Sequence, residues 1–137
     1  MEKFIFRNHP TDLKMQAFGK TEADLLSNAA LGMMYFLYPK YFNIKESERK
    51  EKISVKAENI QNLLVQWLSE ILELSNINDT CYNIFDISQA DDTSIKATIF
   101  GKRIRSRENI KAVTYHELSV EHIGGRWKAT VRFNLKK

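Results

Sequence analysis

The closing stretch of the chain, residues 110–135, constrains the fold most, because its pattern predicts a β-hairpin that can be paired residue by residue. Gly124-Gly125 predicts a two-residue turn with positive φ, which glycine adopts at little cost. Counting back from this turn places Ile123 opposite Arg126. The same count predicts three pairs on one face and three on the other: Val120–Ala129, Leu118–Val131 and His116–Phe133, then Glu121–Lys128, Glu117–Arg132 and Tyr115–Asn134.

The two faces of the predicted hairpin differ in character. One is mainly apolar, and the other carries two pairs of opposite charge, so that a slip of one residue would break both patterns. We therefore expect His116 to be half-buried on the apolar face. We expect Lys111, Tyr115 and Asn134 to share the polar face, which is where a functional site is sought.

The rest of the chain alternates predicted strands with two amphipathic helices. Apolar residues recur at helical spacing after Thr21 and after Asn59, and both residues are good N-caps. The charged residues 45–52 predict a solvated loop, and residues 76–80 a turn. The element order is β-β-α-β-α-β-β-β-β, with strands expected at residues 3–7, 13–18, 53–57, 81–88 and 93–100 and in the hairpin, and helices at 21–38 and 59–72.

This order predicts an α+β fold, with two helices packed on a largely antiparallel, multi-stranded sheet. We expect residues 1–137 to form a single domain. Gly32 interrupts the first apolar stripe and costs about 1 kcal/mol relative to alanine, which predicts close packing at that position. Trp67 lies on the apolar stripe of the second helix and is expected in the core.

Composition excludes several classes of protein. The single cysteine, Cys81, rules out an intrachain disulfide and is typical of a reducing compartment. No run approaches about 18 apolar residues, so no membrane span is expected. The N-terminus lacks a signal-peptide hydrophobic region, and we predict a cytoplasmic protein. The formal net charge of +4 is mild and does not by itself indicate a polyanionic partner.

None of the common catalytic motifs is present in the sequence, neither a phosphate-binding glycine loop nor a metalloprotease or nucleophile-elbow motif. Cys81 has no basic activator near it in the sequence, which argues against a nucleophile. Asp12 is the carboxylate that stands out, in a polar loop between His9 and an apolar strand. It predicts either an Asx-turn or one ligand of a hard cation, and the residues alone leave both open.

Four segments resemble the archease family, in the family's order and near its spacing. The resemblance covers essentially the whole chain, and the segment beginning at Lys111 is the most specific. The segments are His9-Pro10-Thr11-Asp12, Gly19-Lys20-Thr21 through Asn28-Ala29-Ala30, Leu63-Leu64-Val65-Gln66-Trp67-Leu68-Ser69-Glu70, and Lys111-Ala112-Val113-Thr114-Tyr115-His116.

The resemblance implies an activator rather than a stand-alone enzyme. Archeases assist the RtcB-type RNA ligase, which joins RNA ends in tRNA splicing and RNA repair, uses GTP and a divalent metal, and forms a guanylylated histidine on itself. The family promotes that guanylylation and restores turnover. We therefore expect this ligase as the partner, GTP to be bound through the ligase, and any RNA contact to be indirect.

The resemblance also implies site residues. It places an acidic metal site, for calcium, magnesium or manganese, on Asp12 and Asn134, and a functional lysine on Lys111. The family typically has aspartate where this chain has Asn134. Because an amide offers a carbonyl oxygen but no charge, weaker cation binding is expected.

Two other functions remain open from the sequence. The basic residues Arg103, Arg105 and Arg107, together with the hairpin, would suit a module that binds RNA or another polyanion, with affinity that falls steeply as salt rises. A chaperone-like interaction protein without metal is the other alternative.

Overall fold

The computed structural model describes residues 2–8, 12–105 and 110–135, and its elements follow the predicted order. Two helices and seven strands are present within these ranges. They are β1 (Phe4–Asn8), β2 (Asp12–Gly19), α1 (Glu22–Leu37), β3 (Arg49–Lys56), α2 (Ile60–Asn78), β4 (Thr80–Ala90), β5 (Ser94–Arg103), β6 (Ile110–Ile123) and β7 (Arg126–Leu135).

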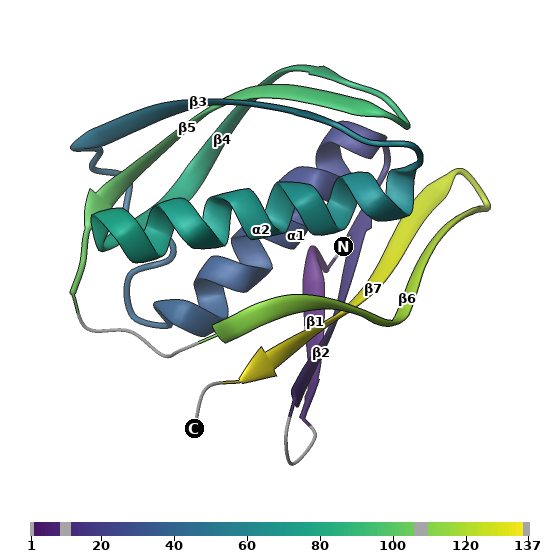
Figure 1. Cartoon of the computed structure of the whole chain (residues 1–137), viewed down its shortest axis with the longest axis horizontal. Coiled ribbons are helices and arrows are strands. Elements are labelled where there is room, and N and C mark those ends of the chain that lie inside the picture. Colours follow the sequence, from purple (N-terminus) through teal and green to yellow (C-terminus); the bar gives the residue numbers. More distant parts are fainter. Residues whose placement is uncertain (1, 9–11, 106–109, 136–137) are drawn as a thin grey trace.

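The strands form two antiparallel sheets rather than one, and the helices lie between them (Figure 1). The four-stranded sheet has the order β1-β2-β7-β6, and the three-stranded sheet has the order β3-β5-β4. Helix α1 packs against both β2 and β4, and α2 packs against both β6 and β4. The α+β class and the antiparallel pairing predicted from the sequence are confirmed. The second sheet forms because each helix has apolar surface to bury on two sides.

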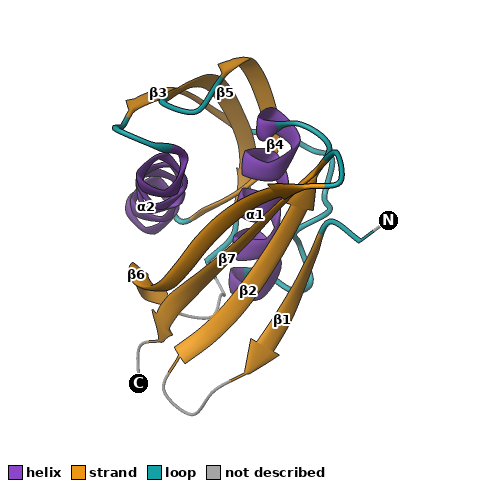
Figure 2. Ribbon diagram, turned by 90° about the vertical axis from the view of Figure 1, so that its right-hand side faces the viewer, coloured by secondary structure: helices purple, strands orange, loops and turns teal. Residues whose placement is uncertain are grey.

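The four-stranded sheet brings the two ends of the chain together. Strand β2 lies between β1 and β7, and its register places Asp12 opposite Asn134 and Lys14 opposite Arg132. Figure 2 shows both helices on one side of this sheet, with its other face uncovered. On the covered face the apolar residues Leu13 and Met15 lie opposite Phe133 and Val131. The polar residues at Asp12 and Asn134 therefore share the uncovered face.

Both predicted N-caps are confirmed. The Thr21 hydroxyl accepts a hydrogen bond from the Asp24 amide at 3.1 Å, and the Asn59 side chain accepts one from the Asn62 amide at 2.9 Å. Helix α2 extends to Asn78 and β4 begins at Thr80, so the predicted turn at residues 76–80 was wrong except at Asp79. Asp79 follows the helix as its C-cap, and its φ of 49° is left-handed, a conformation common just after the end of a helix.

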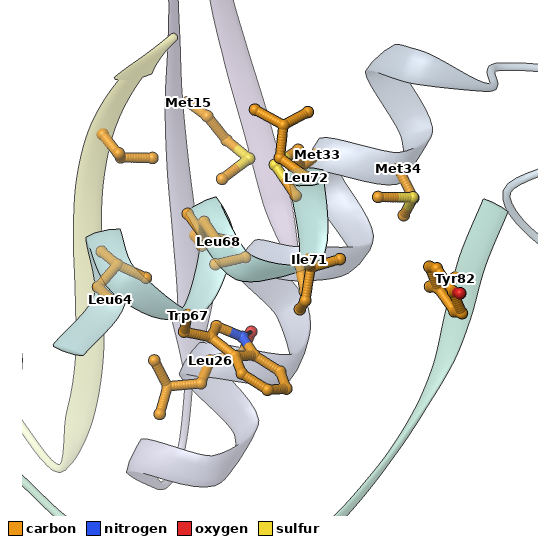
Figure 3. Packing of buried hydrophobic residues seen from close by; sticks show 14 of the residues in the cluster. Met15, Leu26, Met33, Met34, Leu64, Trp67, Leu68, Ile71, Leu72 and Tyr82 are labelled. Carbon is orange, nitrogen blue, oxygen red and sulfur yellow. Dashed lines mark hydrogen bonds between the residues drawn. The ribbon is translucent and has the colours of Figure 1, made fainter. Parts of the chain in front are cut away.

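The core fills the space between the helices and the sheets (Figure 3). Trp67 is fully buried, and its indole nitrogen donates a hydrogen bond to the carbonyl oxygen of Leu26 at 2.9 Å. The prediction that Trp67 belongs to the core is confirmed. The close packing predicted at Gly32 is also confirmed, because a Cβ there would lie 2.6 Å from the Met15 sulfur and 3.0 Å from the Phe4 ring.

Strand β3 begins earlier than its apolar residues predicted. Arg49 pairs with Gly101 and Lys52 with Thr98, so the second half of the predicted solvated loop at residues 45–52 is strand. Strand β3 is an edge of its sheet, and charged side chains such as Lys50 and Lys52 are typical of edges because they discourage pairing with another chain. The charge pattern therefore marked a protected edge strand rather than a loop. No helix in the described part of the chain is long and apolar enough to cross a membrane.

Candidate functional site at the base of the closing hairpin

The β6–β7 hairpin keeps its predicted register only near the turn. The pairs Ile123–Arg126, Glu121–Lys128 and Val120–Ala129 are confirmed, and Gly124 and Gly125 have φ values of 63° and 73°. Beyond the Ser119–Thr130 pair the register shifts, and Thr114 becomes the partner of Arg132. Residues 115–118 of β6 thus occupy the place opposite Val131 alone, which forms a large, irregular β-bulge.

This bulge overturns four of the predicted pairs. The pairs that do not form are Leu118–Val131, His116–Phe133, Glu117–Arg132 and Tyr115–Asn134. The observed partner of Phe133 is Val113, that of Arg132 is Thr114, and that of Asn134 is Ala112. The expectation of a half-buried His116 was wrong, since 70% of its side chain is exposed. Tyr115 is 56% exposed. No local residue pattern indicates the bulge, because residues 110–123 contain neither glycine nor proline.

The bulge contains Glu117, which has an unusual backbone conformation. Its φ is 54°, a left-handed conformation that is uncommon for a residue other than glycine or asparagine. Such a conformation costs roughly 1–2 kcal/mol in a residue with a Cβ. A compensating interaction is therefore expected at this position.

The compensation is an ion-pair network that joins β2, β7 and the bulge. Nη1 of Arg132 donates to both carboxylate oxygens of Asp12, each at 3.1 Å, and Nη2 donates to Oε1 of Glu117 at 2.8 Å. The same Glu117 oxygen lies 3.2 Å from Nε2 of His116. Glu117 thus reaches Arg132 through its side chain although Thr114 is the backbone partner. We name this set, Asp12, Arg132, Glu117 and His116, the Arg132 network.

Burial makes the centre of the Arg132 network sensitive to change. Only 8% of the Arg132 side chain and 18% of the Asp12 side chain are exposed, whereas 53% of Glu117 is exposed. The Nε atom of Arg132 is buried without a hydrogen-bond partner in the described residues. A guanidinium so enclosed depends on its two carboxylates, because an unpaired buried charge is costly.

The described arrangement does not fit a hard-cation site at Asp12. Such a cation binds through carboxylate oxygens, and both oxygens of Asp12 already accept from the positively charged Arg132. The expected second ligand, Asn134, lies opposite Asp12 and is exposed. Within residues 2–8, 12–105 and 110–135, no three His, Cys, Asp or Glu side chains gather as a metal-binding group. The Thr11 and His9 side chains lie outside the described residues.

Lys111 lies apart from the Arg132 network. The register steps from Ile110–Leu135 to Ala112–Asn134, so Lys111 is an inserted residue and Ala112 takes the place opposite Asn134. Lys111 instead lines a hollow of about 370 Å³ beside α2, together with Ser69 and Glu73. The prediction that Lys111, Tyr115 and Asn134 share one face is therefore wrong. The functional role predicted for Lys111 stays a prediction.

The remaining predicted site residues are more scattered. Arg103 ends β5 and Arg105 follows it, and both are exposed, whereas Arg107 lies outside the described residues. The RNA-binding alternative based on these arginines stays a prediction. Burial raises the pKa of the Cys81 thiol to about 12, which agrees with the expectation that it is not a nucleophile.

A second acidic group lies far from the Arg132 network, at the start of α1. The pKa of Glu22 is raised to about 7, first by burial and then by a hydrogen bond and repulsion from Asp92 and by repulsion from Asp91. Sequence reasoning missed this carboxyl group, because its neighbours Asp91 and Asp92 lie far from Glu22 in the sequence.

Comparison with known proteins identifies the fold and the family. The solution structure of Methanobacterium thermoautotrophicum protein 1598 matches with a TM-score of 0.80 and 25% identity, over 98% of this chain and all of that one. A crystal structure from Thermotoga maritima, described as an archease and possible chaperone, matches in fold with a TM-score of 0.64 and 22% identity, over 93% and 94% of the two chains. The class is therefore an α+β protein with the archease fold.

Sequence comparison goes further than the fold. The model of the Archease protein family (MTH1598/TM1083) matches residues 4–135. Protein archease of Methanosarcina mazei is 31% identical over 139 aligned positions, which cover 95% of this chain and 94% of that protein. Protein archease of Pyrococcus abyssi is 25% identical over 94% and 96% of the two chains. The chain belongs to the archease family, as its sequence motifs predicted.

Proposed function

We propose that this protein activates an RtcB-type RNA ligase by promoting guanylylation of the ligase histidine and restoring its turnover. The proposal rests on membership of the archease family over residues 4–135. In this proposal the protein is an activator and not itself the enzyme. GTP and RNA are bound by the ligase, and the archease contributes a surface that docks on it.

The observation that carries the choice of surface is the Arg132 network. The register of β2 and β7 places Asp12 and Arg132 on the uncovered face of the four-stranded sheet, where Arg132 holds Asp12 through two hydrogen bonds. Glu117 and His116 extend from the network into solvent, with 53% and 70% of their side chains exposed. Such a surface, with a rigid buried centre and accessible polar groups, can meet polar and charged groups of a partner.

A divalent metal at Asp12 and Asn134 is not part of this mechanism. Arg132 already supplies a positive charge at Asp12, and the described geometry leaves neither Asp12 oxygen without a donor. In the proposed function Arg132 therefore takes the place of a cation beside this carboxylate. Lys111 would act separately, from the α2 side of the hairpin, as a second contact with the ligase.

The test is a guanylylation assay with a cognate RtcB-type ligase and GTP. Substoichiometric amounts of this protein should raise the rate of ligase guanylylation and allow multiple turnover of RNA joining. An unchanged rate and an unchanged number of turnovers would contradict the proposal. The matched control is the same amount of heat-unfolded protein, which has the same composition and charge.

The variants must separate function from folding. Asp12→Ala would leave the buried Arg132 guanidinium with Glu117 alone, so this variant is expected to unfold more easily and cannot isolate a functional role. Asp12→Asn removes the charge but keeps an oxygen that can accept from Arg132. Loss of stimulation by a folded Asp12→Asn protein, with stimulation kept by Glu121→Gln, would support a role for this carboxylate.

A further inference from the structure

The outer edge of β1 is unpaired and borders a hollow. Among the described strands β1 pairs only with β2, and the Lys3 carbonyl oxygen accepts from the Phe18 amide at 3.0 Å. Because N–H and C=O groups alternate in direction along an antiparallel strand, those of Ile5 and Arg7 also face β2. The backbone groups of Phe4 and Phe6 therefore point away from the sheet, and no backbone partner for them exists among the described residues.

An apolar hollow of about 550 Å³ separates this edge from β4. Lys3 and Phe4 line it on the β1 side, and Phe42 and Ile84 line it on the other. Tyr35 of α1 packs between the two sides, with ring centroids 5.5 Å from Phe4 and 4.7 Å from Phe42. Tyr35 is 39% exposed and Ile84 is 38% exposed, although both are large apolar side chains.

The charges around this edge are mainly basic. Arg7 lies on the uncovered face of β1, and alternation assigns Lys3, just before the strand, to the same face. Lys3 and Lys45 both line the hollow, where Glu2 is the acidic residue. No ion pair within the described residues involves Lys3, Arg7 or Lys45. Arg7 also lies opposite Lys14 on β2, a cross-strand pair of like charge that is unfavourable unless an anion approaches.

A second copy of this chain does not suit the edge. Two β1 strands paired antiparallel about Ile5 would place Lys3 of one copy opposite Arg7 of the other, twice. Like charges directly opposite one another destabilise such a pair. A partner strand with acidic residues opposite Lys3 and Arg7 would instead form two favourable cross-strand charge pairs.

We propose that the β1 edge binds an extended segment of a partner protein by strand addition. The segment carries acidic residues opposite Lys3 and Arg7 and apolar residues opposite Phe4 and Phe6, which face Tyr35 and the hollow. Its backbone pairs with the outward N–H and C=O groups of Phe4 and Phe6, as in other cases of strand addition. This inference is independent of the ligase proposal, since it uses neither the Arg132 network nor Lys111.

The probe is a fluorescent cyclic hairpin peptide whose outer strand reads Glu-Val-Thr-Val-Glu, because a preorganised strand loses less entropy on binding. Binding is measured by fluorescence anisotropy with the full-length protein. Amide hydrogen exchange gives the second measurement, and slower exchange at Phe4 and Phe6 is expected when the peptide is bound. A Lys-Val-Thr-Val-Lys hairpin should bind about tenfold more weakly. Each of its two lysines replaces an attractive pair with a repulsive one, which changes the free energy of binding by several tenths of a kcal/mol.

Charge reversal on the protein completes the test. The double variant Lys3→Glu/Arg7→Glu should no longer bind the acidic peptide and should bind the basic one. The matched control is Lys50→Glu/Lys52→Glu, which makes the same change of charge on exposed residues of another edge strand and should leave binding unchanged. Absence of binding, equal effects of the two double variants, unprotected Phe4 and Phe6 amides, or self-association of the free protein in sedimentation would each overturn the proposal.

Discussion

The two halves of the closing hairpin follow different rules. In the turn half, Ser119 to Thr130, the strands pair in the register that the alternation of side chains predicts. The base half comprises residues 110–118 and 131–135. There β6 shifts relative to β7, whereas β7 keeps its register with β2. Strand β2 pairs with β7 along both halves, and in the base half its Asp12 side chain also joins β6 through Arg132 and Glu117.

The third strand explains why only β6 bulges. Strand β7 pairs with β2 from Asp12–Asn134 to Gly19–Trp127 without a shift, so it cannot accept an extra residue. Strand β6 is the edge of the sheet, where extra residues are tolerated. The bulge then brings Glu117 to Arg132, which Asp12 of β2 has already fixed. The base of the hairpin is a candidate site because the bulge places Glu117 beside the Asp12–Arg132 ion pair.

Replacement of Asp12 is expected to have the largest effect on the stability of the protein. Asp12→Ala leaves a guanidinium that is 8% exposed without the more buried of its two carboxylates and should lower the free energy of unfolding by about 3–5 kcal/mol. Urea unfolding followed by circular dichroism measures this. Glu121→Ala, in the turn half, should change it by less than about 1 kcal/mol, as expected of exposed charge pairs.

A double variant tests whether that effect comes from the ion pair. Asp12→Ala/Arg132→Met removes both charges, so it should be clearly more stable than Asp12→Ala alone. If the double variant were as unstable as the sum of the two single variants, the buried ion pair would not be the source of the difference between the two halves.

A smaller effect is expected at the turn. Gly124→Ala forces a residue with a Cβ to a φ of 63° and should cost roughly 1–2 kcal/mol of unfolding free energy. The surroundings offer no steric obstacle, since nothing lies within 4 Å of a Cβ at that position. Thermal unfolding measures the change, and an unaltered midpoint would show that the turn is not held in this conformation.

Replacement by glycine should have opposite signs in the two halves. At Glu117, with φ of 54°, Gly should be more stable than Ala by about 1 kcal/mol, because glycine relieves the left-handed strain. At Glu121, within a regular strand, Gly should be less stable than Ala by roughly 0.5–1 kcal/mol. The same order at both positions in urea unfolding would exclude a strained bulge at Glu117.

We expect the unmodified chain to bind divalent cations too weakly to measure at Asp12. Isothermal titration with calcium, magnesium and manganese should give no measurable heat at Asp12, because Arg132 holds both its oxygens. The variant Arg132→Met/Asn134→Asp removes the competing charge and adds a carboxylate opposite Asp12, and it should bind one of these ions. Strong binding by the unmodified chain that Asp12→Asn abolishes would contradict the account of Arg132.

Sequence reasoning reached most of the fold because the patterns involved were local. The two helices, their N-caps Thr21 and Asn59 and the turn at Gly124-Gly125 depend on residues within a few positions of one another. The division into two sheets depends on which strands meet across the core, which local alternation does not specify. The start of β3 was missed because an edge strand can carry as many charges as a loop.

The candidate site was only partly accessible to sequence reasoning. Asp12 and Asn134 were identified by resemblance, and the structure brings them opposite one another. Arg132 was predicted to meet Glu117 but not Asp12. A signal for that contact existed in the matching alternation of β2 and β7, with Leu13 and Met15 on one strand and Val131 and Phe133 on the other. The bulge at Glu117 had no local signal, since its partner Arg132 also pairs with Asp12, a residue about a hundred positions earlier in the chain.

The most direct test of the central claim compares the two halves in the ligase assay. The claim is that the base of the hairpin, through the Arg132 network, is the surface that activates an RtcB-type RNA ligase. The measurement is the rate of ligase guanylylation with the unmodified protein, with Asp12→Asn and with Lys128→Gln from the turn half, each first shown to be folded. We predict stimulation by the unmodified protein and by Lys128→Gln, and a loss of at least about tenfold with Asp12→Asn. Equal stimulation by all three proteins, or by none, would contradict the claim.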